Sequence, residues 1–183
     1  METKVANPTA LGLFGFGVTT VLLSLANLGV LDLSIAIIAV AIVLGGFAEI
    51  IAGIFELKLG NTFAGTVFVS FGLFWLSLVL ILLLPTIGPV IAADSVGIGV
   101  YLLLFALYSL LLFIDTLKSI ITLKALLLLV FLLFLTLGIF YVSAIAIFLT
   151  LGGIIGVIAG LLGIYMCTGM IINEDWGEEV FKL

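Results

Sequence analysis

The chain has 183 residues, of which 66% are hydrophobic and 8% are charged, with a formal net charge of −5 at neutral pH. Its mean hydropathy is +1.63, so it carries more apolar surface than a soluble domain of this length can bury, and we expect an integral membrane protein. It contains no histidine and no arginine. This inventory excludes a histidine-based zinc site, a Ser-His-Asp triad and an arginine clamp for phosphate. The acidic balance argues against a nucleic-acid partner. We therefore expect no enzyme activity, no cofactor and no metal.

Apolar segments long enough to cross a bilayer recur six times along the chain. A spanning helix needs about 20 mostly apolar residues, and suitable segments lie at 9–30, 34–56, 63–84, 95–115, 122–140 and 143–171. Charged residues or prolines mark every break except the one at 141–143. The sequence thus predicts an all-α, polytopic membrane protein with a single transmembrane domain over residues 1–183, in contact with lipid as a multi-pass protein of the cell membrane.

The lysines support an even number of spans. With six spans and a cytoplasmic N-terminus, all five fall on the inner side, which is the positive-inside distribution; they are Lys4, Lys58, Lys118, Lys124 and Lys182. The outer loops carry Asp32 and Asp94 as their clear charges. Both termini are expected to be cytoplasmic, and the first span is too long for the core of a removable signal peptide. The acidic tail after residue 173 is interpreted as a solvated end.

The first span opens with NPTALGLFGFGVTT at residues 7–20. Asn7 and Pro8 are suited to the N-cap and first position of a helix. They mark either an ordinary helix start or a helix N-terminus at a pore mouth, where its partial positive charge attracts an anion. Glycine costs roughly 1 kcal/mol against alanine inside a helix. The glycines at 12, 15 and 17 therefore indicate a close backbone approach or an opening.

Glu49 is the most unusual residue of the second span, where it lies within GGFAEIIAG. A carboxylate in lipid is costly unless it faces a cavity, pairs or takes up a proton. A protonated side chain bonded to a neighbouring helix and a role in transport remain equally open. Glu56, nearer the inner surface, is interpreted as an interfacial side chain beside Lys58. Glycines at 152, 156 and 160 repeat every four residues, which favours close helix packing within or between subunits.

The segment ANPTALGLFGFGVTTVLLSLANLG resembles the start of the acetate uptake transporters, the succinate–acetate permease family. The hallmark of that family reads N-P-[AV]-P-L-G-L, and Ala10 replaces its second proline. The resemblance continues through residues 45–85, GVYLLL at 99–104 and TLK at 116–118, so it covers nearly the whole chain. It implies six transmembrane helices and a pore within each subunit, in a urea-channel-like hexameric ring. Members move acetate, other short monocarboxylates or succinate, as proton symporters or as channels.

The resemblance also implies site residues. The family's constriction of a phenylalanine, a tyrosine and a leucine falls on Phe16, Phe71 and Val130. Replacing the tyrosine by Phe71 removes a hydroxyl, and such a dry narrowing disfavours a bare anion. Related sequences carry glutamine where this chain has Glu49. The residues assigned to the substrate path or to coupling are Asn7, Pro8, Leu11, Gly12, Glu49, Asn61, Thr62 and Trp75.

Three functions follow, in order of preference. The first is transport of acetate, or another short mono- or dicarboxylate such as succinate, together with a proton. The second is a passive channel for acetate or for a small neutral solute. The third is a membrane sensor or scaffold that transports nothing, in which Glu49 and the glycines serve assembly only.

Overall fold

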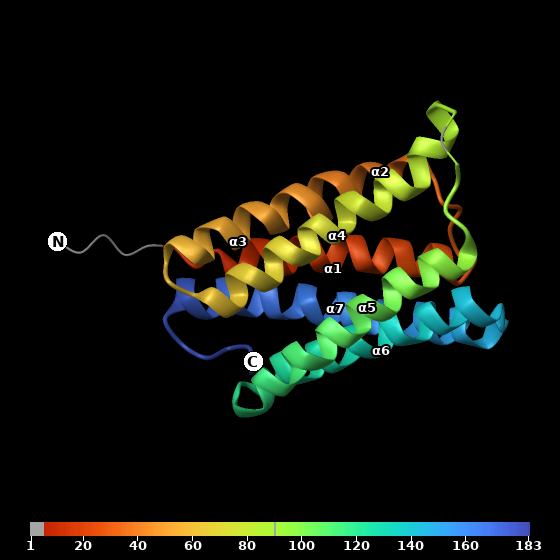
Figure 1. Cartoon of the computed structure of the whole chain (residues 1–183). Coiled ribbons are helices and arrows are strands. Elements are labelled where there is room, and N and C mark those ends of the chain that lie inside the picture. Colours follow the sequence, from red (N-terminus) through yellow and green to blue (C-terminus); the bar gives the residue numbers. More distant parts are fainter. Residues whose placement is uncertain (1–5, 90) are drawn as a thin grey trace.

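The computed structural model describes residues 6–89 and 91–183, and this part of the chain is helical apart from its loops and ends (Figure 1). Lys4, one of the lysines used to predict the topology, lies outside the described residues. The helices in chain order are α1 (Thr9–Asn27), α2 (Ile35–Val40), the π-helical segment η1 (Ala41–Ala48), α3 (Glu49–Lys58), α4 (Thr62–Ile87), α5 (Ser95–Asp115), the 3-10 turn η2 (Thr116–Lys118), α6 (Ile121–Ser143) and α7 (Ala146–Trp176).

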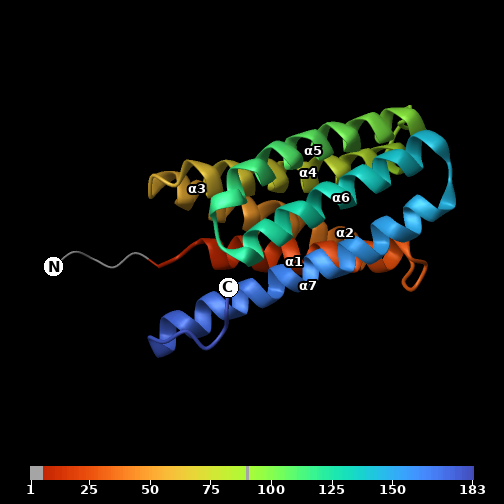
Figure 2. The same cartoon turned by 90° about the horizontal axis from the view of Figure 1, so that it is seen from below.

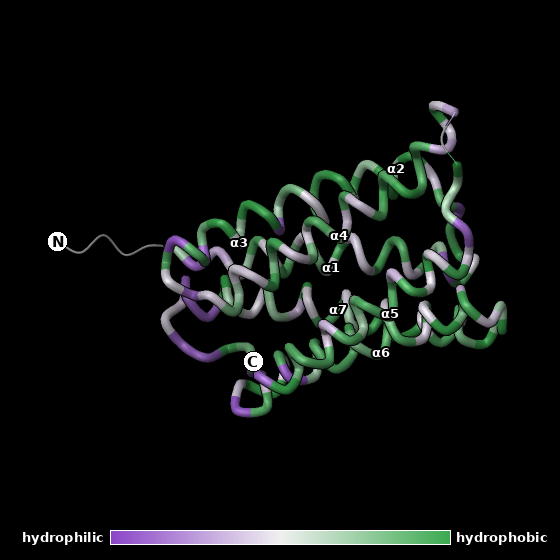
Figure 3. The backbone as a smooth tube through the Cα atoms, in the orientation of Figure 1, coloured by the Kyte–Doolittle hydropathy of each residue, from purple (hydrophilic) through white to green (hydrophobic). Residues whose placement is uncertain are grey.

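Within the described residues, six helical stretches are long and apolar enough to span a membrane. Five are α1, α4, α5 with η2, α6 and α7, and the sixth is the continuous stretch Ile35–Lys58, formed by α2, η1 and α3. Their middle parts are apolar and the polar residues gather at the ends (Figure 3). Many large apolar side chains face outward, including Leu104 and Leu111 of α5. This pattern confirms the all-α membrane fold with six spans.

The six spans form a ring in chain order. The α1 helix packs against the second span, which packs against α4; α5 packs against α6, α6 against α7, and α7 returns to α1. Figures 1 and 2 show this arrangement from two directions, with α5 and α6 running together on one side and α3 and α4 on another. The spans α4 and α5 meet through side chains, and the ring encloses a central space that side chains from several helices line.

Glycines allow the tightest contact in the ring, between α1 and α7. A Cβ atom added to Gly17 would lie 2.7 Å from the carbonyl oxygen of Gly160, and one added to Gly160 would lie 2.7 Å from that of Gly17. The glycine repeat of α7 therefore serves packing within one subunit at this position. Gly15 is equally close to the second span, since its Cβ would collide with the backbone oxygen of Leu44 in η1.

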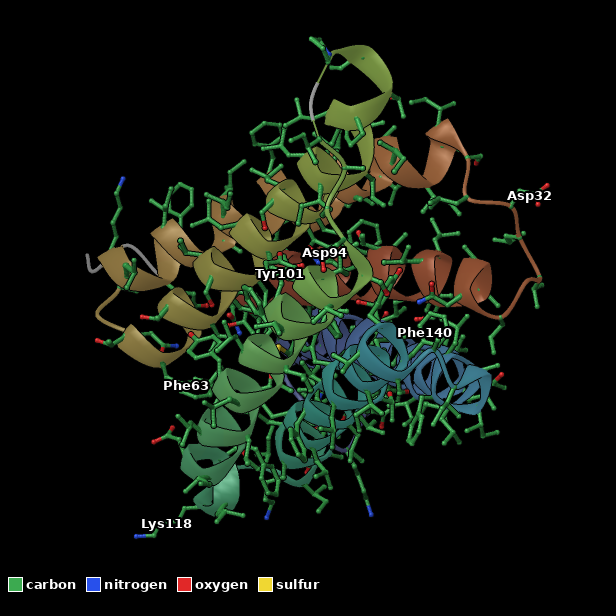
Figure 4. All side chains as sticks on the ribbon, turned by 45° about the vertical axis from the view of Figure 1, so that its right-hand side comes forward. Asp32, Phe63, Asp94, Tyr101, Lys118 and Phe140 are labelled. Carbon is green, nitrogen blue, oxygen red and sulfur yellow. The ribbon has the colours of Figure 1, made fainter. Side chains whose placement is uncertain are left out.

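Aromatic side chains close the ring between α4 and α5. The rings of Phe74 and Tyr101 stack with centroids 5.5 Å apart, and Phe105 meets Phe74 edge-on at 4.8 Å. Hydroxyl groups add two links, from Ser77 to Tyr101 at 2.6 Å and from Ser70 to Tyr108 at 3.1 Å. Tyr101 lies in this region in Figure 4. Large side chains thus fill the space between the α4 and α5 backbones.

The loops divide between two ends of the bundle. One end holds the turn between α3 and α4, the turn between α5 and α6, and the C-terminus; the other holds the remaining three loops (Figure 1). The described lysines all belong to the first end, whereas Asp32 and Asp94 belong to loops of the second; Figure 4 shows Lys118 pointing away from the bundle. Asn61 and Asp94 cap α4 and α5 by accepting the backbone N–H groups of Ala64 and Gly97.

The C-terminal tail folds back onto α7, with its acidic side chains in the exposed positions that a solvated end predicts. The Asn173 side chain accepts the backbone N–H groups of Val180 and Phe181 and donates to the carbonyl oxygen of Phe181 at 2.8 Å. The Tyr165 hydroxyl donates to the carbonyl oxygen of Lys182 at 2.9 Å. These contacts satisfy backbone groups of the tail itself, while the acidic side chains remain exposed.

Candidate functional site

An inner cavity of about 240 Å³ lies inside the ring, toward the end of the bundle that carries the lysines. Side chains of five spans, together with residues that flank them, form its wall, which is mostly apolar. The lining residues are Thr9, Leu13, Phe16, Glu49, Asn61, Phe63, Ala64, Val67, Phe68, Phe71, Ile120, Leu123, Leu126, Leu127, Val130, Met166 and Met170. Among the described lining residues Glu49 is the only ionisable one. The cavity is large enough for a small organic solute and has few groups that could bind its charge.

An outer cavity of about 100 Å³ extends toward the other end. Its lining residues are Phe16, Thr20, Leu23, Ser24, Asn27, Leu33, Phe71, Phe74, Trp75, Leu78, Leu82, Ile98, Leu102, Leu133, Phe134, Leu137 and Tyr141. Thr20, Ser24 and Asn27 come from one face of α1, at helical spacing beyond Phe16. They place two hydroxyl groups and one amide along a wall whose other residues are apolar apart from Trp75 and Tyr141.

Phe16 and Phe71 are the two residues common to both cavities. They lie between the inner and the outer space, and both are buried, with exposed fractions of 8% and 5%. The Phe71 ring is fixed by neighbouring rings: it stacks on Phe134 at 6.0 Å and is tilted against Phe105 and Tyr108 at 6.3 and 6.0 Å. Val130 of α6 lines the inner cavity only.

Gly163 of α7 makes room for the Phe16 ring. A Cβ atom at position 163 would lie 3.0 Å from the Cδ1 atom of Phe16, closer than an ordinary van der Waals contact. On α1 itself, Phe16 is flanked by Gly15 and Gly17, which let this helix approach the second span and α7. The glycines of the first span therefore bring the helix that carries Phe16 close to two neighbours.

Glu49 and Trp75 join the two cavities through a hydrogen bond. Trp75, which lines the outer cavity, donates its Nε1–H to the Oε1 atom of Glu49, which lines the inner one; the distance is 3.1 Å. The Glu49 side chain is 1% exposed, and its Oε2 atom has no hydrogen-bond partner among the described residues. Its carboxyl group is therefore buried with half of its hydrogen-bonding capacity unused, an arrangement that is costly for an ionised group.

Glu56 occupies a different setting, and the interpretation of this residue as an interfacial side chain beside Lys58 is wrong. Its side chain is 3% exposed. The Thr9 hydroxyl donates to Glu56 Oε1 at 2.5 Å, and Asn61 Nδ2 donates to Oε2 at 2.7 Å. Lys58 instead lies over the ring of Phe55, 5.4 Å from its centroid. Glu56 thus holds Thr9 and Asn61, two residues of the inner cavity wall, from the end of α3.

A family profile described as the GPR1/FUN34/yaaH family matches residues 1–177, nearly the whole chain. The chain belongs to this family. The Escherichia coli K12 protein named "Succinate-acetate/proton symporter SatP" is 42% identical over 182 residues, which cover 100% of this chain and 97% of the relative. A yeast relative from Saccharomyces cerevisiae, "Ammonia transport outward protein 2", is 38% identical over 170 residues, covering 88% of this chain and 60% of its own.

A solved structure of the family has the same fold. The structure titled "Structure of the bacterial acetate channel SatP" superimposes with a TM-score of 0.95 at 43% sequence identity, covering 97% of this chain and 98% of that one. The resemblance that the N-terminal motif indicated is thus confirmed, as is the expectation of a membrane protein related to transporters and channels.

The family's expected site residues divide into two groups in the structure. Phe16, Phe71, Val130, Glu49, Asn61 and Trp75 line one cavity or both. Asn7, Pro8, Leu11, Gly12 and Thr62 line neither. The helix α1 begins at Thr9, after Pro8, and the Asn7 side chain accepts the backbone N–H of Thr9 at 3.0 Å. Leu11 is 43% exposed on the outside of the bundle.

Several lining residues were not singled out from the sequence of this family member. Thr9 was missed because its role depends on a contact with Glu56, 47 residues away. Thr20, Ser24 and Asn27 carried a usable signal, since they continue the face of Phe16 along one helix as its polar positions. Met166 of α7 lies in an apolar segment and carried no signal that would set it apart.

Proposed function

We propose that this protein transports acetate, and related short carboxylates such as succinate, across the cell membrane. The proposed path runs through the interior of one subunit, from the outer cavity past Phe16 and Phe71 into the inner cavity. The observation that carries the proposal is the pair of cavities that meet at these two side chains. The names of the bacterial symporter and of the solved acetate channel, each more than 40% identical, supply the substrate class.

The proposed orientation places the lysine end and both termini in the cytoplasm, because positively charged residues favour that side. In this orientation the solute meets the polar groups of Thr20, Ser24 and Asn27 first, and then the phenylalanines. Val130 and Asn61 line the cavity on the cytoplasmic side. We also propose a urea-channel-like hexameric ring, as the family resemblance implies, with a separate path in each subunit. Tight intrasubunit packing of α1 on α7 leaves the exposed faces of helices such as α5 for lipid or neighbouring subunits.

Movement of acetate together with a proton suits this path better than movement of the bare anion. No lysine lines either cavity among the described residues, and the narrowing is made of phenylalanines. Moving one uncompensated charge against the membrane potential costs about 2.3 kcal/mol per 100 mV. Co-transport of a proton removes that cost.

The alternative is a passive channel for acetate or a small neutral solute, and the same apolar narrowing favours the neutral one. Proteoliposomes loaded with a pH gradient separate the alternatives. A symporter accumulates radiolabelled acetate above its equilibrium level when the outside is acidic, beyond the accumulation in protein-free vesicles. A channel equilibrates acetate without added accumulation. Uptake no faster than in protein-free vesicles, for acetate and succinate alike, contradicts the proposed function.

A further inference from the structure

Glu49 carries an unused hydrogen-bonding group in a residue of the inner cavity wall. Its side chain is 1% exposed, and it lines this cavity. The Trp75 N–H is donated to Oε1 at 3.1 Å, so the oxygen left without a partner among the described residues is Oε2. Buried polar groups are nearly always paired in folded proteins, and each exception calls for an explanation.

The other polar side chains of this wall already have partners. Thr9 donates its hydroxyl hydrogen to Glu56, and the Asn61 side chain donates to Glu56 and accepts the backbone N–H of Ala64. Apart from these two and Glu49, the described lining residues are apolar. Glu49 is therefore the side chain of the wall at which the polar group of a solute finds a free partner.

The surroundings favour the neutral form of the Glu49 carboxyl group, because no positive charge compensates the ionised form. The helices α1 and α4, which pack against the second span, contain no charged side chain. On its own span, Glu56 has hydrogen-bond donors of its own, and Lys58 lies over the Phe55 ring. A neutral carboxyl group has one O–H. With Oε1 accepting from Trp75, this O–H lies on Oε2, where a carboxyl oxygen of a solute can accept it.

The apolar part of the wall suits the hydrocarbon chain of such a solute. Four helices contribute to it, with residues such as Leu13, Val67, Leu127 and Met166, and the cavity of about 240 Å³ has room for a chain of a few carbon atoms. Each methylene group that moves from water into such a site raises the affinity about fourfold. A second carboxyl group at the far end of the chain would meet apolar side chains instead and lose its hydrogen bonds to water.

We propose that Glu49 is the carboxyl-binding residue of the inner cavity, and that this site prefers short monocarboxylates with a longer hydrocarbon chain, ranking butyrate above propionate and acetate, and above succinate. The carboxyl group of the solute accepts the Glu49 O–H, and its chain lies along the apolar wall. The inference rests on the transport function proposed above, and it adds where the solute is held and which solutes are held best.

The test measures binding to the full-length protein in detergent. Thermal unfolding is followed at rising concentrations of sodium acetate, propionate, butyrate and succinate, with sodium chloride keeping the ionic strength constant. A ligand that binds the folded state raises Tm by an amount set by its concentration and affinity. Butyrate and succinate have the same number of carbon atoms, so their comparison isolates the second carboxyl group.

Two variants of similar shape test the role of Glu49. Glu49→Gln keeps an oxygen for the Trp75 N–H and keeps a donor for the solute, whereas Glu49→Met has no donor. The Met variant in the same detergent also shows how far the acids act on Tm without the site. Uptake of the four acids by the same proteins is measured separately in proteoliposomes.

The wild type and Glu49→Gln are expected to bind butyrate about tenfold more tightly than acetate and at least tenfold more tightly than succinate, and Glu49→Met to lose at least tenfold in affinity for butyrate. The inference is overturned, even with normal uptake, if Glu49→Met binds as tightly as Glu49→Gln, or if the wild type binds acetate or succinate as tightly as butyrate. The ranking in the wild type tests the inference even if a variant does not fold. Uptake of none of the acids by the wild type refutes the proposed function, and the inference with it.

Discussion

Removing the Glu56 carboxylate should destabilise the end of the bundle that carries the lysines. This carboxylate accepts hydrogen bonds from Thr9 at the start of α1 and from Asn61 at the start of α4, while itself belonging to the end of α3. Three spans thus meet at one buried side chain, 3% exposed. In Glu56→Ala, the Thr9 hydroxyl and the Asn61 amide both lose their acceptor.

The size of the effect follows from the two bonds. A hydrogen bond to a charged group contributes about 1.5–3 kcal/mol, so Glu56→Ala is expected to lower the free energy of unfolding by about 3–6 kcal/mol. Glu56→Gln presents one acceptor and one donor to two donor groups, and should lose about half as much. For a protein of this size, 1 kcal/mol corresponds to roughly 2–4 °C in Tm, which places the decrease for the alanine variant at about 6 °C or more.

Thermal unfolding of the purified protein in detergent measures these differences. Glu179→Gln, a change at an exposed carboxylate of the tail, serves as the matched control and should leave Tm unchanged. The expected Tm values decrease from the control to Glu56→Gln and then to Glu56→Ala. If the alanine variant unfolds at the temperature of the control, Glu56 does not hold the three helix ends together and the reasoning is refuted.

Three further changes test other parts of the structure. Phe16→Ala should widen the narrowing and raise the uptake of succinate relative to acetate in proteoliposomes; an unchanged ratio and an unchanged rate would favour a scaffold over a transporter. Gly163→Ala places a methyl group 3.0 Å from the Phe16 ring, so acetate uptake should fall severalfold with little change in Tm, and equal uptake would show that the ring does not border the path. Ala144→Gly relieves a left-handed backbone conformation with φ of 57°, so Tm should rise, corresponding to roughly 1 kcal/mol; a fall in Tm would contradict this reading.

The spans could be predicted from the sequence because their signals are local. An apolar segment of about 20 residues is best explained as a membrane helix. The charges at Lys58 and Lys118 mark turns, and this signal does not depend on contacts with distant parts of the chain. The weakest predicted break, at 141–143, shows the limit of this approach. There α6 ends at Ser143, and Ala144 caps it in a left-handed backbone conformation. This conformation is unusual for alanine, so the residue type gives no sign of the turn. The π-helical segment Ala41–Ala48 likewise depends on packing against α1 and α4 rather than on residue types.

The candidate site was predictable only in part, since it depends on contacts between distant residues. Glu49 stood out because an ionisable residue within an apolar span is costly, and Phe16 followed from the family motif. The setting of Glu56 did not follow from its neighbours in sequence, because it is fixed by Thr9, 47 residues away. Glu56 was interpreted as an interfacial side chain beside Lys58, yet Glu56 is buried and the Lys58 side chain lies over an aromatic ring.

The central claim is that acetate passes through the subunit between Phe16, Phe71 and Val130, and a blocking substitution tests it most directly. Val130→Trp enlarges a buried side chain, 3% exposed, in the wall of the inner cavity, whereas Ile158→Trp makes the same addition to an α7 residue that is 51% exposed. Radiolabelled acetate uptake into proteoliposomes should be lost in Val130→Trp and retained in Ile158→Trp, with both variants folded. Uptake that survives in Val130→Trp at the wild-type rate would contradict the account.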